Sequence, residues 1–181
     1  MEMEIARHDW TGMRCGCGDT AAHLVAELLQ LTEDGDERAS VQAGLEHHVW
    51  SSVVLWEPAL AVTSVALAAL AEDLEPAARL RFLDLLQYLV TGEGTDRESA
   101  AEGLDLPERC RSAATQGMWL LYQEVMSTRS PGLAGAAFEV LTVIEPDRAR
   151  LARVREAAAE WLPVCCRTGL CDDDFDGGDR M

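Results

Sequence analysis

The chain contains no lysine, so its 15 basic side chains are all arginines, and they stand against 32 aspartates and glutamates. The resulting net charge of −17 opposes binding to nucleic-acid phosphates and to anionic lipid headgroups, which both need clustered basic side chains. We therefore predict no nucleic-acid partner and no membrane partner. The same charge attracts a basic protein, or it serves only to keep the chain soluble. The all-arginine usage, together with abundant alanine, indicates a GC-rich bacterial genome.

Long apolar runs are also missing. The longest stretch without a charged side chain, residues 58–71, is too short to cross a bilayer and is typical of a buried helix. Residues 1–10 are rich in charge and hold no apolar segment, so they do not read as a secretory signal. We predict a cytoplasmic protein, in which the six cysteines stay reduced.

Catalytic motifs are absent as well. The sequence has no nucleophile elbow, no His-Glu-x-x-His motif and no phosphate-binding loop, so we predict a protein that is not an enzyme and holds no cofactor. One region combines acids, histidines and tryptophans, which form good anchors for a basic protein partner. The alternatives are acid–base chemistry by a histidine and a carboxylate, or histidines that only hydrogen-bond within a turn. The predicted partner-binding residues are Glu46, His47, His48, Trp50, Trp56 and Glu57.

The prolines predict where helices begin. Five of the six precede an apolar-rich stretch of helical period, and proline is tolerated in the first helical turn because its missing N–H has no intrahelical acceptor there. We predict an all-α fold of about seven helices, arranged as a right-handed α-α superhelix, with a compact bundle as the alternative. The predicted helices cover residues 20–32, 37–49, 58–72, 76–90, 107–127, 131–145 and 146–162.

The predicted helical domain spans residues 19–163 and is interrupted by a glycine-containing loop at 92–106. An irregular segment, residues 1–18, precedes it, and an acidic tail rich in cysteine and aspartate, residues 164–181, follows it. Residues 50–57 have strand-like propensity, but their helical surroundings favour a turn or a helix end.

Three stretches of this domain have a recognisable pattern. They are residues 45–50 (Leu-Glu-His-His-Val-Trp), 57–60 (Glu-Pro-Ala-Leu) and 79–86 (Arg-Leu-Arg-Phe-Leu-Asp-Leu-Leu). In this pattern the chain resembles a group of HEAT-repeat (α-solenoid) proteins from actinomycetes, over roughly residues 19–162. The resemblance implies a stack of helical hairpins that acts as a protein-interaction module and has no assigned enzymatic activity.

The cysteines suggest an alternative function, zinc binding. The candidate ligands are Cys15, Cys17, Cys165, Cys166 and Cys171, with His8 and His23 near the first pair. Thiolates from both groups could share one tetrahedral zinc if the two ends of the chain approach each other. The usual Cys-x-x-Cys spacing is absent, however, and the ends of a solenoid lie far apart. Reduced thiols without a metal are therefore the other interpretation, and we assign no metal ligand.

Two charged patterns suggest no further site. Residues 172–177 match the first half of an EF-hand calcium loop but lack the glutamate at its twelfth position, so we predict a solvated acidic tail. The arginines within residues 148–155 spread over more than one helix face, which favours pairing with nearby acids over a phosphate site.

These observations predict a non-enzymatic interaction module that binds a basic protein partner. One specific form is an immunity or inhibitor protein of a basic toxin, because complementary charge gives fast association. The alternative is a zinc-binding protein or an accessory enzyme subunit that uses the two cysteine groups.

Overall fold

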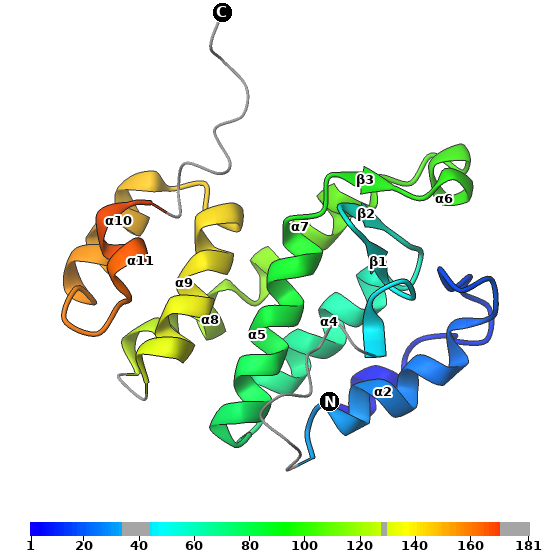
Figure 1. The fold of residues 1–181 in the computed structure, drawn as a ribbon, viewed down its shortest axis with the longest axis horizontal. Helices are drawn as coiled ribbons and strands as arrows, with labels where there is room; N and C mark the ends of the chain where they lie inside the picture. The colour runs from blue at the N-terminus through cyan, green and yellow to red at the C-terminus, as the bar shows by residue number, and fades with distance from the viewer. Residues whose placement is uncertain (34–43, 128–129, 171–181) are drawn as a thin grey trace, which may run out of the picture.

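The computed structural model describes residues 1–33, 44–127 and 130–170 of the chain, and these are mostly helical (Figure 1). The predicted mainly helical class is confirmed. The longer helices are α4 (Ala59–Leu70), α5 (Pro76–Val90), α7 (Leu106–Gln116), α8 (Met118–Met126), α9 (Pro131–Ile144) and α10 (Arg148–Ala157). The shorter ones are α1 (Glu2–Ala6), a 3₁₀ helix (Ala21–His23), α2 (Leu24–Gln30), α6 (Arg97–Ala101) and α11 (Val164–Thr168).

Helix α5 lies at the centre of the molecule and packs against α4, α7 and α9 (Figure 1). Its side chains Phe82, Leu86 and Leu89 are fully buried in the core. Helix α4 is buried on several sides, as its nearly continuous apolar sequence predicts, and it also contacts α7 and α1. The hairpins α4–α5 and α8–α9 are joined through the contact of α5 with α9.

All five prolines lie at or just before the start of a helix, although the helix predicted at 146–162 begins two residues later and ends at Ala157. Pro76 and Pro131 are the first residues of α5 and α9, and Pro107 is the second residue of α7. The Ser130 hydroxyl accepts a hydrogen bond from the Leu133 amide at 3.1 Å and so caps α9.

A small three-stranded sheet corrects the all-α prediction for residues 50–57. Strand β1 (Trp50–Ser51) pairs antiparallel with β2 (Val54–Leu55), and β2 pairs parallel with β3 (Gly94–Thr95). Backbone hydrogen bonds extend the second pairing, with the Asp96 amide donating to the Leu55 carbonyl at 2.9 Å. The strand propensity of Val54 and Leu55 prevails here because a partner strand from a distant part of the chain satisfies their backbone groups.

The predicted loop at 92–106 is likewise built of regular elements. It contains β3 and α6, and the Asp96 carboxylate caps α6 by accepting the amides of Glu98 and Ser99. The segment 1–18 contains α1, which packs against α4.

Gly117 separates α7 from α8, whereas the sequence predicts a single helix over residues 107–127. A Cβ atom at Gly117 would collide with the Leu67 side chain on α4, so this close approach of backbone to α4 favours glycine.

Most of the helix predicted at 37–49, and the tail from Cys171 onward, lie outside the described residues. Within the described ranges, no helix has the length and hydrophobicity needed to cross a membrane.

Candidate metal centre

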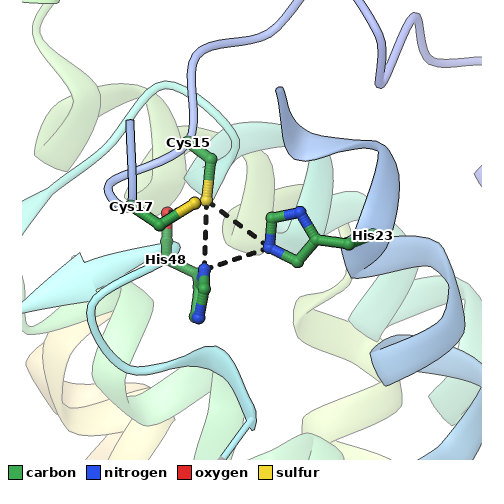
Figure 2. A group of neighbouring side chains, drawn as sticks. All are labelled: Cys15, Cys17, His23 and His48. Atoms are coloured by element: carbon green, nitrogen blue, oxygen red, sulfur yellow. Dashed lines mark hydrogen bonds between the residues drawn. The ribbon is translucent and has the colours of Figure 1, made fainter. Parts of the chain in front are cut away.

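Cys15, Cys17, His23 and His48 form a cluster of side chains (Figure 2). One ligand atom from each side chain lies within 4.8 Å of every other, and these atoms are two thiol sulfurs and two imidazole nitrogens. The residues come from separate parts of the chain: the turn before the 3₁₀ helix, the end of that helix, and the turn before β1. Cys15 is buried, His48 is half-buried, and Cys17 and His23 are exposed.

The ligand atoms of Cys15, His23 and His48 are spaced close to the edges of a tetrahedral metal site. Cys15 Sγ lies 3.2 Å from His48 Nδ1 and 3.7 Å from His23 Nε2, and the two nitrogens are 3.0 Å apart. Ideal zinc bond lengths give edges of about 3.5 Å between sulfur and nitrogen and about 3.3 Å between two nitrogens. The side chains are therefore close to the positions they would take around a zinc ion.

The turn that carries Cys15 and Cys17 depends on its glycines. The Gly18 amide donates to the Cys15 carbonyl at 3.0 Å, and Gly18 has a φ of +91°, in the region that favours glycine. Gly16 lies against the β1–β2 hairpin and its flanking residues. A Cβ atom at Gly16 would collide with the His47 carbonyl oxygen and would come within 2.9 Å of the Trp56 ring. Its amide donates to the His48 carbonyl at 3.0 Å, which fixes the cysteine turn beside the histidine turn.

His23 is oriented by a hydrogen bond on the far side of its ring. Its Nδ1 lies 3.0 Å from the carbonyl oxygen of Thr20, and only a protonated Nδ1 can donate to that oxygen. In the neutral ring Nε2 then carries a lone pair, and this lone pair is directed toward Cys15 and His48 (Figure 2). A backbone carbonyl that fixes the tautomer in this way is typical of metal-binding histidines.

His48 is held by a tight turn. The His48 amide donates to the Leu45 carbonyl at 3.1 Å, and the amide of His47, whose φ is +67°, donates to the Trp50 carbonyl at 2.6 Å. The next residue, Val49, is fully buried and anchors the turn to the core. This backbone geometry turns the His48 ring toward Cys15.

Burial favours the uncharged forms of the ligands. It raises the pKa of the Cys15 thiol to about 11, although the backbone amides of Cys17 and Gly16 favour the thiolate. Burial also lowers the pKa of His48, and the charge on His23 lowers it further. A bound cation would reverse the penalty on the thiolates, because it supplies the positive charge that they lack here.

Arg14 ties the cysteine turn to the rest of the protein. Its backbone amide and its Nε both donate to Glu57 Oε2, at 3.0 and 2.9 Å, and its Nη1 donates to Glu102 at 2.7 Å. These bonds connect the turn with the start of α4 and with the end of α6, and the Glu102 and Glu57 carboxylates raise the pKa of Arg14.

The predicted partner-binding residues have different environments. His48 belongs to the metal cluster, whereas His47 is exposed and its Nδ1 lies 3.2 Å from the Ser51 hydroxyl. Trp50 is 2% exposed and stacks on Tyr88 with ring centroids 5.0 Å apart, so it belongs to the core.

The others lie around the cluster. Trp56 is half-buried and packs against Gly16, and Glu57 holds Arg14. Glu46 is half-buried and forms a β-bridge with Trp50.

The two cysteine groups do not meet, which corrects the idea of one zinc shared between them. Cys165 and Cys166 lie near Glu139, in a separate group formed by α9 and α11 at the opposite side of the molecule (Figure 1). Cys171 lies outside the described residues. The sequence did not place His48 beside Cys15, Cys17 and His23, because this contact depends on the turn before β1 rather than on sequence spacing.

No protein-family model matches the chain, and neither a curated protein nor a solved structure matches it significantly.

Proposed function

We propose that this protein binds one zinc ion through Cys15, Cys17, His23 and His48, and that the ion stabilises the fold. The observation that carries this proposal is the lone pair of His23 Nε2, directed by the Thr20 carbonyl toward Cys15 Sγ and His48 Nδ1. A residue that served only to cap or pack would not need this orientation.

The ligand set favours zinc over other metals. Two thiolates with two imidazoles in a tetrahedron are typical of zinc, whereas calcium and magnesium prefer oxygen ligands. With all four coordination positions filled by protein, no position stays open for a substrate or a reactive water molecule. The proposed role is therefore structural, in agreement with the prediction of a non-enzymatic protein.

The zinc would add a further link between short segments that the Arg14 ion pairs and the Gly16–His48 backbone hydrogen bond already connect. The cysteine turn, the 3₁₀ helix and the turn before β1 each contain few residues, and short elements gain stability mainly from tertiary contacts. The segment that the ion would hold in place begins with α1 and carries Ile5 and Trp10 into the core. Loss of the metal would thus loosen the packing of this segment against α4.

Metal analysis of the purified full chain tests the proposal. We expect about one zinc ion per chain, and we expect Cys17→Ser and His23→Ala to lose it, since each removes one of four ligands. Matched controls are Cys165→Ser, a cysteine of the other group, and His47→Ala, an exposed histidine beside His48. Folded wild-type protein without zinc, or equal loss from the control variants, would overturn the assignment.

A second candidate function, the interaction module predicted from the sequence, draws support from the net charge of −17. We propose a cytoplasmic protein, with HEAT-like stacking of its hairpins, that binds a basic partner such as a toxin through the segment 46–57. His47, Ser52 and Val53 are exposed there, and the cluster beside them would make the surface rigid. Complementary charge would speed association with such a partner.

Co-expression with basic proteins encoded beside its gene tests this second function. We expect one of them to be toxic alone and harmless together with this chain, and His47→Glu or Glu46→Lys to change the affinity of the purified pair. Glu156→Lys on α10, which is exposed and lies on the opposite side of the molecule from β1 and β2 (Figure 1), is the matched control. Unchanged toxicity for every neighbour would count against the interaction module.

A further inference from the structure

Helix α8 has two apolar faces, and among the described residues only one of them is fully covered. Met118, Leu121 and Val125 face the core, as their spacing predicts. On the other face, Trp119 is 71% exposed and Met126 is 45% exposed. Trp119, Tyr122 and Met126 are spaced i, i+3 and i+7 along one side of the helix, with the exposed Trp119 and Met126 on either side of the buried Tyr122. Exposed apolar patches of this kind mark binding surfaces on soluble proteins.

This side of α8 forms one wall of a groove of about 310 Å³, whose other wall is α10. The groove is fixed in place, because the Trp161 indole beyond α10 donates to the Val125 carbonyl of α8 at 2.7 Å. Such a volume lies near the lower limit of small-ligand pockets, which is about 300 Å³. The lining residues are Trp119, Tyr122, Met126, Arg150, Arg153, Val154 and Ala157.

The only charged side chains that line this groove are arginines, on a chain of net charge −17. Arg150 lies over the Trp119 ring, 5.9 Å from its centroid, and is held there by Glu145 and Asp147 at 3.5 and 3.6 Å. Arg153 lies one turn further along α10 and is exposed. Glu145 and Asp147 offset much of the charge of Arg150, so the exposed Arg153 supplies most of the positive charge beside Trp119. Trp and Arg are among the residues that contribute most to protein interfaces.

We propose that the groove between α8 and α10 binds an acidic peptide segment of a partner protein, which inserts one aromatic or aliphatic side chain against Trp119. The apolar wall accepts the anchor side chain, and the two arginines pair with carboxylates on either side of it. An anchor residue fits the small volume of the groove. The surrounding acidic surface would repel an acidic segment elsewhere, so charge complementarity directs it to this site.

This inference does not depend on the proposed zinc site. The groove lies on the α10 side of the molecule, whereas the cysteine and histidine cluster lies on the side of α2 (Figure 1). The proposed binding chemistry is also opposite to that of the segment 46–57, where we propose a basic partner. A failure of either proposal therefore leaves the other unaffected.

Fluorescence anisotropy of labelled peptides, measured with the full chain, tests the proposal. The probe is Glu-Asp-Phe-Leu-Asp-Glu, and the matched peptides are Glu-Asp-Ala-Ala-Asp-Glu, which lacks the anchor, and Arg-Arg-Phe-Leu-Arg-Arg, which reverses the charge. We expect saturable binding of the probe only, weakening as the salt concentration rises. Trp119→Ala should weaken it by about thirtyfold, and Arg153→Glu by about tenfold.

The exposed Arg109 on α7 provides the control, and Arg109→Glu should leave the affinity of the probe unchanged. Because Trp119 and Arg153 are exposed, both variants should keep the thermal midpoint of the wild type, which the same samples can show. Tighter binding of the arginine peptide, equal binding of the peptide without the anchor, or probe binding that survives both substitutions would overturn the proposal.

Discussion

His23 Nε2 lies 3.0 Å from His48 Nδ1, although 25 positions separate the two residues in the sequence. The Thr20 carbonyl keeps the His23 proton on Nδ1, so Nε2 can only accept a hydrogen bond. When both rings are neutral and no metal is bound, this contact is a hydrogen bond only if His48 donates from Nδ1. With zinc bound, both nitrogens give their lone pairs to the ion, and the His48 proton has to move to Nε2.

This relationship predicts a change of tautomer on metal binding. Long-range nitrogen–proton NMR spectra of the histidine rings should show His48 protonated at Nδ1 in zinc-free protein and at Nε2 after zinc is added. His23 should keep its proton on Nδ1 in both states. His47, which is exposed and bonded to Ser51, serves as the internal control. A His48 ring with the same tautomer in both states would show that it does not bind the ion.

Gly16 provides a test of the cysteine turn that leaves every ligand in place. We expect Gly16→Ala to weaken zinc binding and to lower the free energy of unfolding by about 1–3 kcal/mol, because its Cβ would collide with the His47 carbonyl and crowd the Trp56 ring. Chemical unfolding with and without zinc measures both effects.

The control is Gly132→Ala in the first turn of α9. There a Cβ atom would meet only the Ser130 hydroxyl, at 3.8 Å, so alanine should be tolerated or should stabilise the helix slightly. If both variants behave alike, the tight contact at Gly16 does not position the ligands.

The start of most helices could be predicted because the determinants are local. Pro76, Pro131 and the Ser130 cap act within one turn of the chain, and sequence alone shows them. The break at Gly117 could not be predicted, since it depends on contact with Leu67 from another helix. The strands at 50–55 were missed for a related reason, because their partner at 94–95 lies far along the sequence.

Three of the four residues of the metal cluster could be predicted from the sequence. The pair Cys15 and Cys17 is visible as a short motif, and the sequence also showed His23 nearby. His48 is 33 positions from Cys15, and nothing in that spacing indicates contact. The contact arises because the Gly16 amide pairs with the His48 carbonyl, a backbone bond that depends on the folded arrangement of the two turns.

Arg79 is a buried cation on α5. Its guanidinium donates to the Glu124 carboxylate at 3.1 Å. It also donates to the carbonyl oxygens of Leu70 and Glu72, at 3.0 and 2.7 Å, which lie at the end of α4 and just beyond it. Removing one partner of a buried ion pair leaves the other in an apolar setting, so we expect Arg79→Met to cost about 3 kcal/mol in urea unfolding.

The double variant Arg79→Met with Glu124→Leu should recover part of that loss, because it removes the buried Glu124 carboxylate as well. The carbonyls at the end of α4 would still lack their donor, so recovery should be incomplete. A double variant less stable than the single one would show that the ion pair does not dominate the contribution of Arg79.

Asp147 links the stability of α10 to pH. Its carboxylate accepts a hydrogen bond from the Arg150 amide at 2.9 Å, and this bond lowers the pKa of Asp147 below its usual value of 3.8. A carboxylate with a lowered pKa in the folded state contributes stability above pH 3.8, and that contribution disappears as the pH falls through the folded-state value. The stability difference between wild type and Asp147→Ala should therefore be constant near neutral pH and shrink below pH 3.8.

The control is Ser130→Ala, which removes an uncharged cap from α9, so its stability difference should not follow pH in this way. Thermal unfolding across this range measures both, and parallel pH profiles for the two variants would show that the charge of Asp147 does not contribute to the cap.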